Sequence, residues 1–586
     1  MCKLLKYQLI TKKDIIMLNR HLQAFLLGAA SLFTVFASGE VEWLYSGSTI
    51  AEQNVEEGAR GWILKVSSSG TGLLQCTGIS QSGTNVTGAA TSRRLLDLNA
   101  PIMNASGVEY KINKFSNALF KDSTVVDTII LPSELIAIPQ DAMRGKSSTL
   151  KRIVITGDKI KTIGTYAFYQ NASITNITGV FNGLESIGTG AFSSCSNLKG
   201  EIIINSDNFT FASGNTGNNG TFQSCSNLEG FIVNGDVKGA LPRSLFHSCT
   251  SLKRVQLSKN PTNLVTSIEL FVFYSCTALT SIYPLRFPKL TFIADGAFHS
   301  CSLLKGDFSV ESDKLSFGTS ANNYGTFYQC KKLNSFKNYG SLTGTLPTRA
   351  FHSCSALKEL QLTTNKVCKL TSLSTTSIYG CGALTNIHPL VFDRLTTIGK
   401  QALDESPMVK GDFIIVGNKS LQIGEEALGW VAGKYTSFSV EGAVTSISTR
   451  FLQSCTTVTN VYFGSTIASP GNAFLYGCKA LRVLTMPYRP ASFGGTASFD
   501  NISVRQMVVR ADRRDTGVNG WFNPAKYTPW GELSQSVKNE WLNLSYEAKK
   551  ARGWLDIKVP RGVTLGLTKN QWLTDIPSSR SLFMLR

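Results

Sequence analysis

Cysteines recur along this chain at a nearly constant interval, and that interval constrains the fold more than any other feature. Each lies in a similar frame, as in "AFSSCSNL" at 191–198, with a large apolar residue three positions before it and usually a leucine three positions after it. A sequence period of about 25 residues is the signature of a solenoid, in which each repeat forms one coil. The cysteines in this frame are Cys195, Cys225, Cys249, Cys276, Cys301, Cys330, Cys354, Cys381, Cys455 and Cys478.

The same frame without cysteine occurs at 167–174 and 402–409, and more loosely near Ala118, Ala142 and Ala427. Counting these copies predicts a β-rich repeat solenoid of about fifteen coils, each of 23–30 residues. After each cysteine the apolar residues alternate, as in "LKRVQL", which is typical of a short strand. We expect these strands on one face, a tighter turn on the other, and a continuous apolar core between stacked coils.

A block of four coils is duplicated in the sequence. Cys195 and Cys301 are 106 residues apart, and the next three cysteines each recur after 105 residues. The segments "LFHSCTSLKRVQL" (245–257) and "AFHSCSALKELQL" (350–362) share eight of thirteen letters. Duplication in whole coils preserves the stacking of a solenoid, whereas a compact enzyme core would rarely tolerate it.

The residue pattern of these repeats resembles that of the BspA-like class of leucine-rich repeats over roughly residues 110–490. That resemblance implies a leucine-rich repeat solenoid, and members of such families are mostly described as surface adhesins or antigens. The chain departs from the usual pattern because the frequent "LP" is missing after many of its strands. It also carries Asn/Gly insertions such as "ASGNTGNNG" at 212–220.

The ends of the chain differ from the repeats. Residues 1–39 contain the apolar run 22–37 and predict a cleaved signal peptide, because a membrane span needs about 20 apolar residues; an uncleaved amino-terminal anchor is the alternative. Residues 40–110 predict a β-rich cap, and 111–490 the solenoid. Residues 491–586, rich in Trp and basic residues, predict a cap or an attachment module for envelope or glycan, with an amphipathic helix within 532–553.

Composition and motifs argue against several classes of function. The net charge of +19 is spread thinly, whereas nucleic-acid binding usually needs a concentrated basic stripe. The sequence contains no HExxH, P-loop, GxSxG or dinucleotide fingerprint, so we expect no enzyme activity and no cofactor. After the signal there is no apolar segment of 18 residues, so we expect an exported chain, secreted or on the cell surface, without a membrane span.

The repeated cysteines allow two interpretations. Neighbouring coils would bring them within disulfide range, yet Asn171 and Ser406 occupy the same position and cannot form disulfides. This favours buried thiols packed under a turn, with a weak S–H bond to a carbonyl. Cys76 and Cys368 lie outside the pattern and are better candidates for pairing. His-x-Cys occurs three times, but these pairs lie about two coils apart, too far for one zinc site, so we expect no metal.

Rings occupy the position two before the cysteine in six successive coils, alternating imidazole and phenol. Side chains stacked about 5 Å apart form aromatic contacts, so this aromatic strip could stiffen the turn side of the solenoid. Alternatively, it could dock a sugar or protein ligand, with pH-sensitive binding near the ordinary histidine pKa of about 6.5. The residues are His247, Tyr274, His299, Tyr328, His352 and Tyr379.

The strands offer a second candidate surface, and it is where we expect ligand contacts first. One strand position carries polar and aromatic residues: Gln256, Tyr283, Gln361, His388 and Tyr462. The leading hypothesis is therefore non-enzymatic adhesion or recognition of an extracellular protein or glycan. A self-associating component of the envelope or matrix is the main alternative, and an inhibitor or sensor of a secreted enzyme is a weaker one.

Overall fold

The computed structural model describes residues 109–485 almost continuously, and several strands on either side of them. Within that span the gaps are 122–125, 147, 213–218, 417–419, 430–433, 465–466, 468–469 and 482. The chain forms two compact units, residues 1–184 and residues 185–586. The helix expected within 532–553 and most of the predicted signal peptide lie outside the described residues.

The first unit opens with a seven-stranded sheet in the order β1-β2-β7-β8-β5-β4-β3. Its longest members, β4 (Gly61–Gly70) and β5 (Leu73–Ser82), pair antiparallel. The shorter members are β1 (Phe33–Val35), β2 (Val41–Trp43), β3 (Thr49–Ala51), β7 (Ile102–Asn104) and β8 (Glu109–Phe115). Region 40–110 is thus rich in strands, and its role as a cap stays a proposal. The strand β1 falls inside the segment predicted as a signal peptide.

Parallel pairing then takes over in the first unit. The strands β6 (Leu95–Asp97), β9 (Thr128–Ile130), β11 (Arg152–Val154) and β13 (Asn176–Thr178) form one parallel sheet, and β10 (Ala137–Ile138) pairs with β12 (Thr162–Ile163). The last strand of this unit is β14 (Phe181–Asn182). Two strands per repeat are therefore established before the duplicated block begins.

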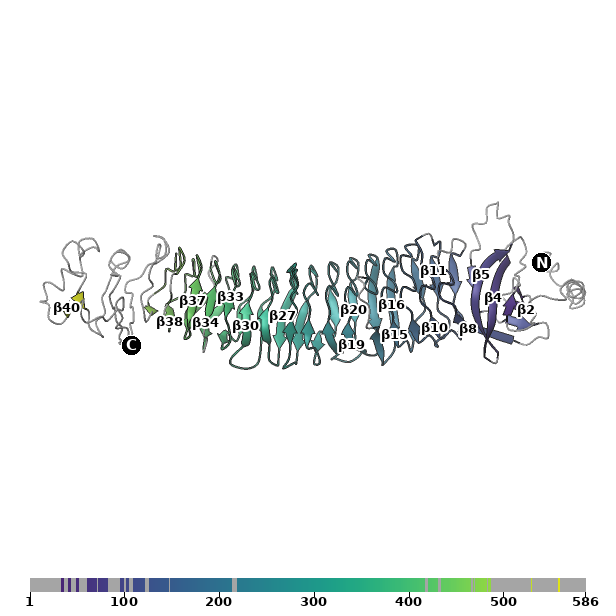
Figure 1. Cartoon of the computed structure of the whole chain (residues 1–586), viewed down its shortest axis with the longest axis horizontal. Coiled ribbons are helices and arrows are strands. Elements are labelled where there is room, and N and C mark those ends of the chain that lie inside the picture. Colours follow the sequence, from purple (N-terminus) through teal and green to yellow (C-terminus); the bar gives the residue numbers. More distant parts are fainter. Residues whose placement is uncertain are drawn as a thin grey trace, which may run out of the picture. The chain divides into compact units, whose positions relative to one another are not determined.

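In the second unit each coil contributes a strand after the cysteine position, which we call the first strand, and a second strand before the next turn. Equivalent strands stack in parallel, coil upon coil (Figure 1). The first strands are β16 (Gly200–Asn205), β18 (Leu228–Val233), β20 (Arg254–Gln256), β22 (Ser281–Tyr283), β25 (Gly306–Val310), β27 (Leu333–Asn338), β29 (Glu359–Gln361), β31 (Asn386–His388), β34 (Lys410–Ile415), β36 (Lys434–Val440), β38 (Asn460–Phe463) and β39 (Val483–Thr485).

The second strands were expected only as an apolar element next to the turn. They are β15 (Ser186–Ile187), β17 (Phe209–Phe211), β19 (Val237–Leu241), β21 (Leu264–Ile268), β24 (Phe292–Ile293), β26 (Ser316–Phe317), β28 (Thr343–Leu346), β30 (Lys369–Leu373), β33 (Thr397–Ile398), β35 (Leu421–Ile423) and β37 (Val444–Ile447). The fold is a β-solenoid of about 13 coils, near the expected fifteen. The described residues contain no helix.

Phenylalanines three positions before the cysteines form a stacked spine inside the second unit. Phe222 lies 5.0 Å from Phe192 and 5.4 Å from Phe246 between ring centroids, and all three rings are nearly parallel. The stack continues through Phe273, Phe298, Phe327 and Phe351. Every ring is fully buried, and burying each side chain contributes about 1.5–3 kcal/mol to the stability of the fold.

The turn before each cysteine holds a residue in the left-handed region, which non-glycine residues seldom adopt. Ser248 has φ of 60°, and its N–H donates to the carbonyl of Tyr274 in the next coil at 2.8 Å. Ser275 repeats the geometry toward His299. Because these bonds run from turn to turn, the turns keep the same register as the strands.

Prolines divide the first strands into separate sheets. The sheet containing β16, β18, β20 and β22 ends at Tyr283, and the next begins after Pro284 with β23 (Arg286–Phe287). The following break comes after His388, before Pro389 and β32 (Val391–Phe392). Both of these breaks fall at a proline, which has no N–H for the ladder. Beyond residue 485 the described elements are β40 (Thr528–Pro529) and β41 (Ile557–Lys558).

Candidate functional site

The cysteine position is a hydrogen-bonded slot in the core. The thiol of Cys249 donates to the carbonyl of Phe222 at 3.0 Å, and Cys276 donates to Phe246 at the same distance. Ser406 uses the slot in the same way, with its hydroxyl 2.8 Å from the carbonyl of Ile378. Asn171 does so through its amide, 3.0 Å from the carbonyl of Met143. This confirms the expected thiol–carbonyl bond and explains why three residue types share one position.

The thiols are shielded from water, and from Cys225 onward burial raises the pKa of each. The pKa of Cys381 rises to about 12. Cys368, proposed as a candidate for pairing, is a buried thiol outside any disulfide, so that expectation is wrong. Its sulfur lies in the core, where burial raises its pKa to about 11. Cys76 is likewise buried on β5.

The aromatic strip forms a continuous stack along the turns. Ring centroids are 4.9 Å apart for His247–Tyr274, 4.4 Å for Tyr274–His299 and 4.7 Å for His299–Tyr328, with interplanar angles below 20°. Tyr328–His352 and His352–Tyr379 continue it at 5.0 and 4.8 Å with more tilt. All six side chains are half-buried. The rings cover one another's faces, so a ligand would meet their edges.

Neighbouring groups set the charge state of the strip. Burial lowers the pKa of His247, His299 and His352; for His299 the nearby Asp295 opposes this shift and Arg349 adds to it. Each imidazole Nδ1 lies 2.8–3.0 Å from the hydroxyl of the following serine. In each His-x-Cys pair the ring is half-buried on the turn surface, while the sulfur is buried within the coil. Among the described residues, no group of three His, Cys, Asp or Glu could hold a metal ion.

The strand-face residues are divided among three sheets. Gln256 on β20 lies opposite Tyr283 on β22, and Gln361 on β29 lies opposite His388 on β31. Tyr462, on β38 in the third sheet, lies opposite Ser439 and Thr485. Tyr283 is 49% exposed and Tyr462 37% exposed, and His388 is also exposed. The expected row therefore exists as two Gln–aromatic pairs and one separate tyrosine.

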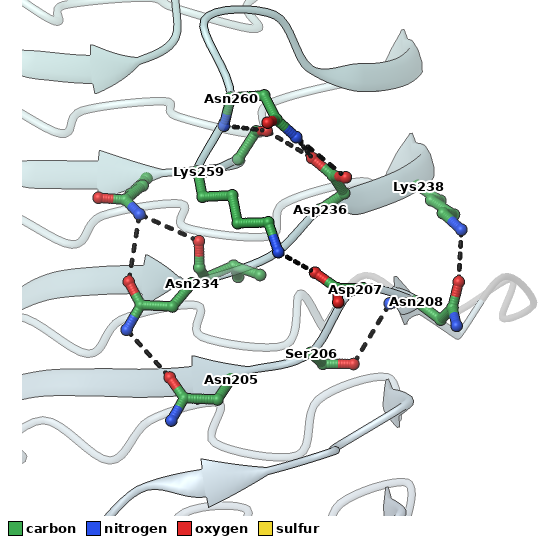
Figure 2. Close-up of polar contacts among 12 residues, drawn as sticks. Asn205, Ser206, Asp207, Asn208, Asn234, Asp236, Lys238, Lys259 and Asn260 are labelled. Atoms are coloured by element: carbon green, nitrogen blue, oxygen red, sulfur yellow. Dashed lines mark hydrogen bonds and ion pairs between the residues drawn. The ribbon is translucent and has the colours of Figure 1, made fainter.

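An amide ladder borders the first pair (Figure 2). The amide of Asn234 donates to Asn205 at 3.0 Å, and the amide of Gln256 donates to Asn234 at 3.3 Å. The same Gln256 nitrogen donates to the carbonyl of Val233 at 3.1 Å. Three consecutive coils are thus joined by amides that carry no charge.

Charges beside this ladder are paired across two coils. Figure 2 shows Lys259 reaching Asp207, with nitrogen and oxygen 2.6 Å apart. Arg254 forms a bidentate ion pair with Glu201, in which Nε lies 2.5 Å from Oε1 and Nη2 lies 2.6 Å from Oε2. That contact passes over Gly230, the residue in register between them, where a Cβ would lie 2.7 Å from the Glu201 carboxylate. The surface around Gln256 therefore presents neutral amides beside neutralised charges.

Two exposed residues of this surface were not predicted from the sequence. Asn234 and Tyr339 each follow the end of a first strand, and Tyr339 is 48% exposed. They stand 105 residues apart, at the same position of the duplicated block. That equivalence was the available signal, but only the strand ends show that both side chains face solvent.

The parallel first strands, the stacked coils and the slot geometry repeated from coil to coil together define a leucine-rich repeat solenoid. The chain belongs to the family described as BspA type leucine-rich repeat region. Six copies of that repeat match, in overlapping segments at 103–229, 182–305, 215–358, 280–410 and 371–505. No curated protein matches the chain in sequence.

Solved structures of bacterial repeat proteins are similar to this chain. A leucine-rich repeat protein from Bacteroides ovatus is 21% identical, over 72% of this chain and 92% of that chain, with a TM-score of 0.44. A leucine-rich cell surface protein from Faecalibacterium prausnitzii is 16% identical, over 79% of this chain and 95% of that chain, with a TM-score of 0.30. In the part of the chain that the structure describes, no helix has the length and apolarity needed to cross a membrane.

Proposed function

We propose that this chain is an exported, non-enzymatic protein that recognises an extracellular protein or glycan through the face formed by its first strands. The observation that carries the proposal is the pairing of a half-buried glutamine with an exposed ring in register beside it. This pairing occurs at Gln256–Tyr283 and again at Gln361–His388. A regular face of polar and aromatic side chains suits recognition of a large partner.

Export is supported by the family and by the apolar run at 22–37. Residues 1–39 would then be a signal peptide, residues 40–110 an amino-terminal cap, and residues 491–586 a cap or attachment module. Binding without catalysis suits the candidate surfaces, because Glu201 and Asp207 are engaged in ion pairs with Arg254 and Lys259.

The aromatic strip has a different role in this proposal. Its stacked rings hold the turns of six coils in register, which stiffens the turn side of the solenoid. Ring edges at His247 to Tyr379 are the secondary place for ligand contacts.

A binding screen tests the proposal. The exported chain is measured against immobilised matrix proteins and glycans at physiological salt, and then as the double variant Tyr283→Ala/His388→Ala. We expect saturable binding that weakens at least about tenfold in the double variant. The matched control is Leu303→Ala, which removes an exposed apolar side chain (44% exposed) from a turn and should leave binding unchanged.

Two results would count against it. Binding that disappears with modest added salt would indicate attraction by the dilute positive charge instead. Concentration-dependent oligomers without any ligand would support the self-associating envelope component.

A further inference from the structure

The duplicated block places two equivalent patches on the same face of the second unit. The first patch consists of Asn234, Gln256 and Tyr283. The second patch consists of Tyr339, Gln361 and His388. Every member of the second patch is 105 residues after its counterpart. In each patch the strand residue (Gln256 or Gln361) is followed, in register on the next coil, by an exposed ring.

The two patches also share their hydrogen bonding. Gln256 Nε2 donates to the carbonyl of Val233 at 3.1 Å, and Gln361 Nε2 donates to the carbonyl of Asn338 at 3.1 Å. Both bonds use the amide nitrogen and leave the Oε1 acceptor without a partner among the described residues. The glutamines are therefore held in one orientation, with an acceptor and a neighbouring ring ready for a ligand.

The chemistry of both patches is polar but weakly charged. Amides, phenols and an imidazole lie beside the glutamines, and two of the nearby charge pairs are Arg254–Glu201 in the first patch and Lys337–Glu359 in the second. Asp236, beside the first patch, accepts hydrogen bonds from Ser258 and Asn260. Charges engaged in this way favour an ionic partner less than free charges would. Planar amides and exposed rings instead match a ligand made of hydroxyl groups and apolar ring faces.

The spacing of the patches restricts the ligand further. Gln256 and Gln361 are four coils apart, and one strand spacing of about 4.8 Å per coil places the patches about 19 Å apart along the solenoid. A ligand that used both would have to repeat its own chemistry along a line. We propose that the two patches bind one linear, neutral glycan at two points along its chain. This inference rests on the proposed function and names its ligand class.

Two linked contacts raise affinity beyond either one, because the second is made at high effective concentration. A glycan that reaches both patches should therefore bind about 100-fold more tightly than a disaccharide of the same sugar. Either single substitution, Tyr283→Ala or His388→Ala, should lower the affinity for the longer glycan about 100-fold, to that of the disaccharide. The disaccharide should lose about half of its binding capacity in each single variant and all of it in the double variant.

The experiment uses the full exported chain and immobilised neutral polysaccharides: starch, cellulose, xylan, mannan and galactan. Oligosaccharides of two and ten units from any polymer that binds are then titrated by calorimetry against the wild-type chain and the three variants. Because both side chains are exposed, melting temperatures of the variants should equal the wild-type value, which separates lost contacts from lost folding.

Each outcome distinguishes the two proposals. Loss of the length advantage in both single variants supports the inference. Sensitivity to only one substitution, or equal affinity for two and ten units, overturns the paired patches. Binding to a matrix protein but to no neutral glycan overturns the inference while the proposed function survives. Absence of any ligand overturns both.

Discussion

The thiol of Cys249 donates a hydrogen bond to the carbonyl oxygen of Phe222 in the preceding coil, at 3.0 Å. The same carbonyl accepts the N–H of Cys225, so it is satisfied from its own coil and from the next. This arrangement recurs with Phe246, Phe273 and Phe298 as acceptors. The slot therefore couples neighbouring coils through the core, on the side where no strand ladder runs.

Substitution of Cys249 should depend on whether the new side chain can donate. In Cys249→Ala the hydrogen bond is lost and a small cavity remains, so the free energy of unfolding should fall by about 1–2 kcal/mol. Cys249→Ser should cost less, because Ser406 makes the same bond at 2.8 Å. Urea unfolding followed by circular dichroism measures both. A serine variant less stable than the alanine variant would contradict the hydrogen-bond role.

The buried thiols should resist alkylation in the folded chain. Burial raises the pKa of Cys381 and Cys478 to about 12, so at pH 8 both remain protonated and weakly nucleophilic. Iodoacetamide at pH 8 should label neither residue in the native chain and both in denaturant, as read by mass spectrometry of peptides. Equal labelling in the two conditions would show that the coils open readily.

Acid should destabilise the strip of stacked rings. Burial holds the pKa of His247, His299 and His352 below the ordinary 6.5, so the unfolded chain binds more protons as the pH falls. The stabilisation from these neutral imidazoles is complete above pH 6.5 and is lost as the pH falls through that value toward their lowered pKa values.

Melting temperatures between pH 7.5 and 5 test this. The wild-type chain should lose more stability on acidification than a variant with all three histidines changed to tyrosine, which preserves ring stacking without an imidazole. Identical pH profiles for the two chains would assign the acid response to other groups.

Gly220 should not tolerate a side chain. A Cβ there would lie 1.7 Å from the carbonyl oxygen of Ser244 in the next coil, and that oxygen belongs to rigid backbone. Gly220→Ala should therefore cost more than about 2 kcal/mol in the free energy of unfolding. The matched control is Gly382→Ala, because a Cβ at Gly382 meets nothing within 4 Å. Equal stability of the two variants in urea would contradict the close packing of these turns.

Much of the architecture follows from the sequence alone. The cysteine spacing predicts the coils, their stacking and the face that carries the first strands, because a repeat of about 25 residues can bury its apolar side only against a copy of itself. Asn171 and Ser406 in the cysteine position predict a buried donor in place of a disulfide. The alternation of His247 and Tyr274 predicts a stack of rings, which lies along the turns as expected.

Other features depend on register, which varying coil lengths hide from the sequence. Insertions between coils decide which residue of one strand lies opposite which residue of the next, so Glu201 meets Arg254 two coils away only because Gly230 stands between them. Pro284 ends one sheet and so separates Tyr283 from the following strands. The repeat itself was determined by the sequence, since burial of its apolar residues is local and periodic. The surface that can meet a ligand was decided by the tertiary structure, because side chains become neighbours there only after the coils have stacked.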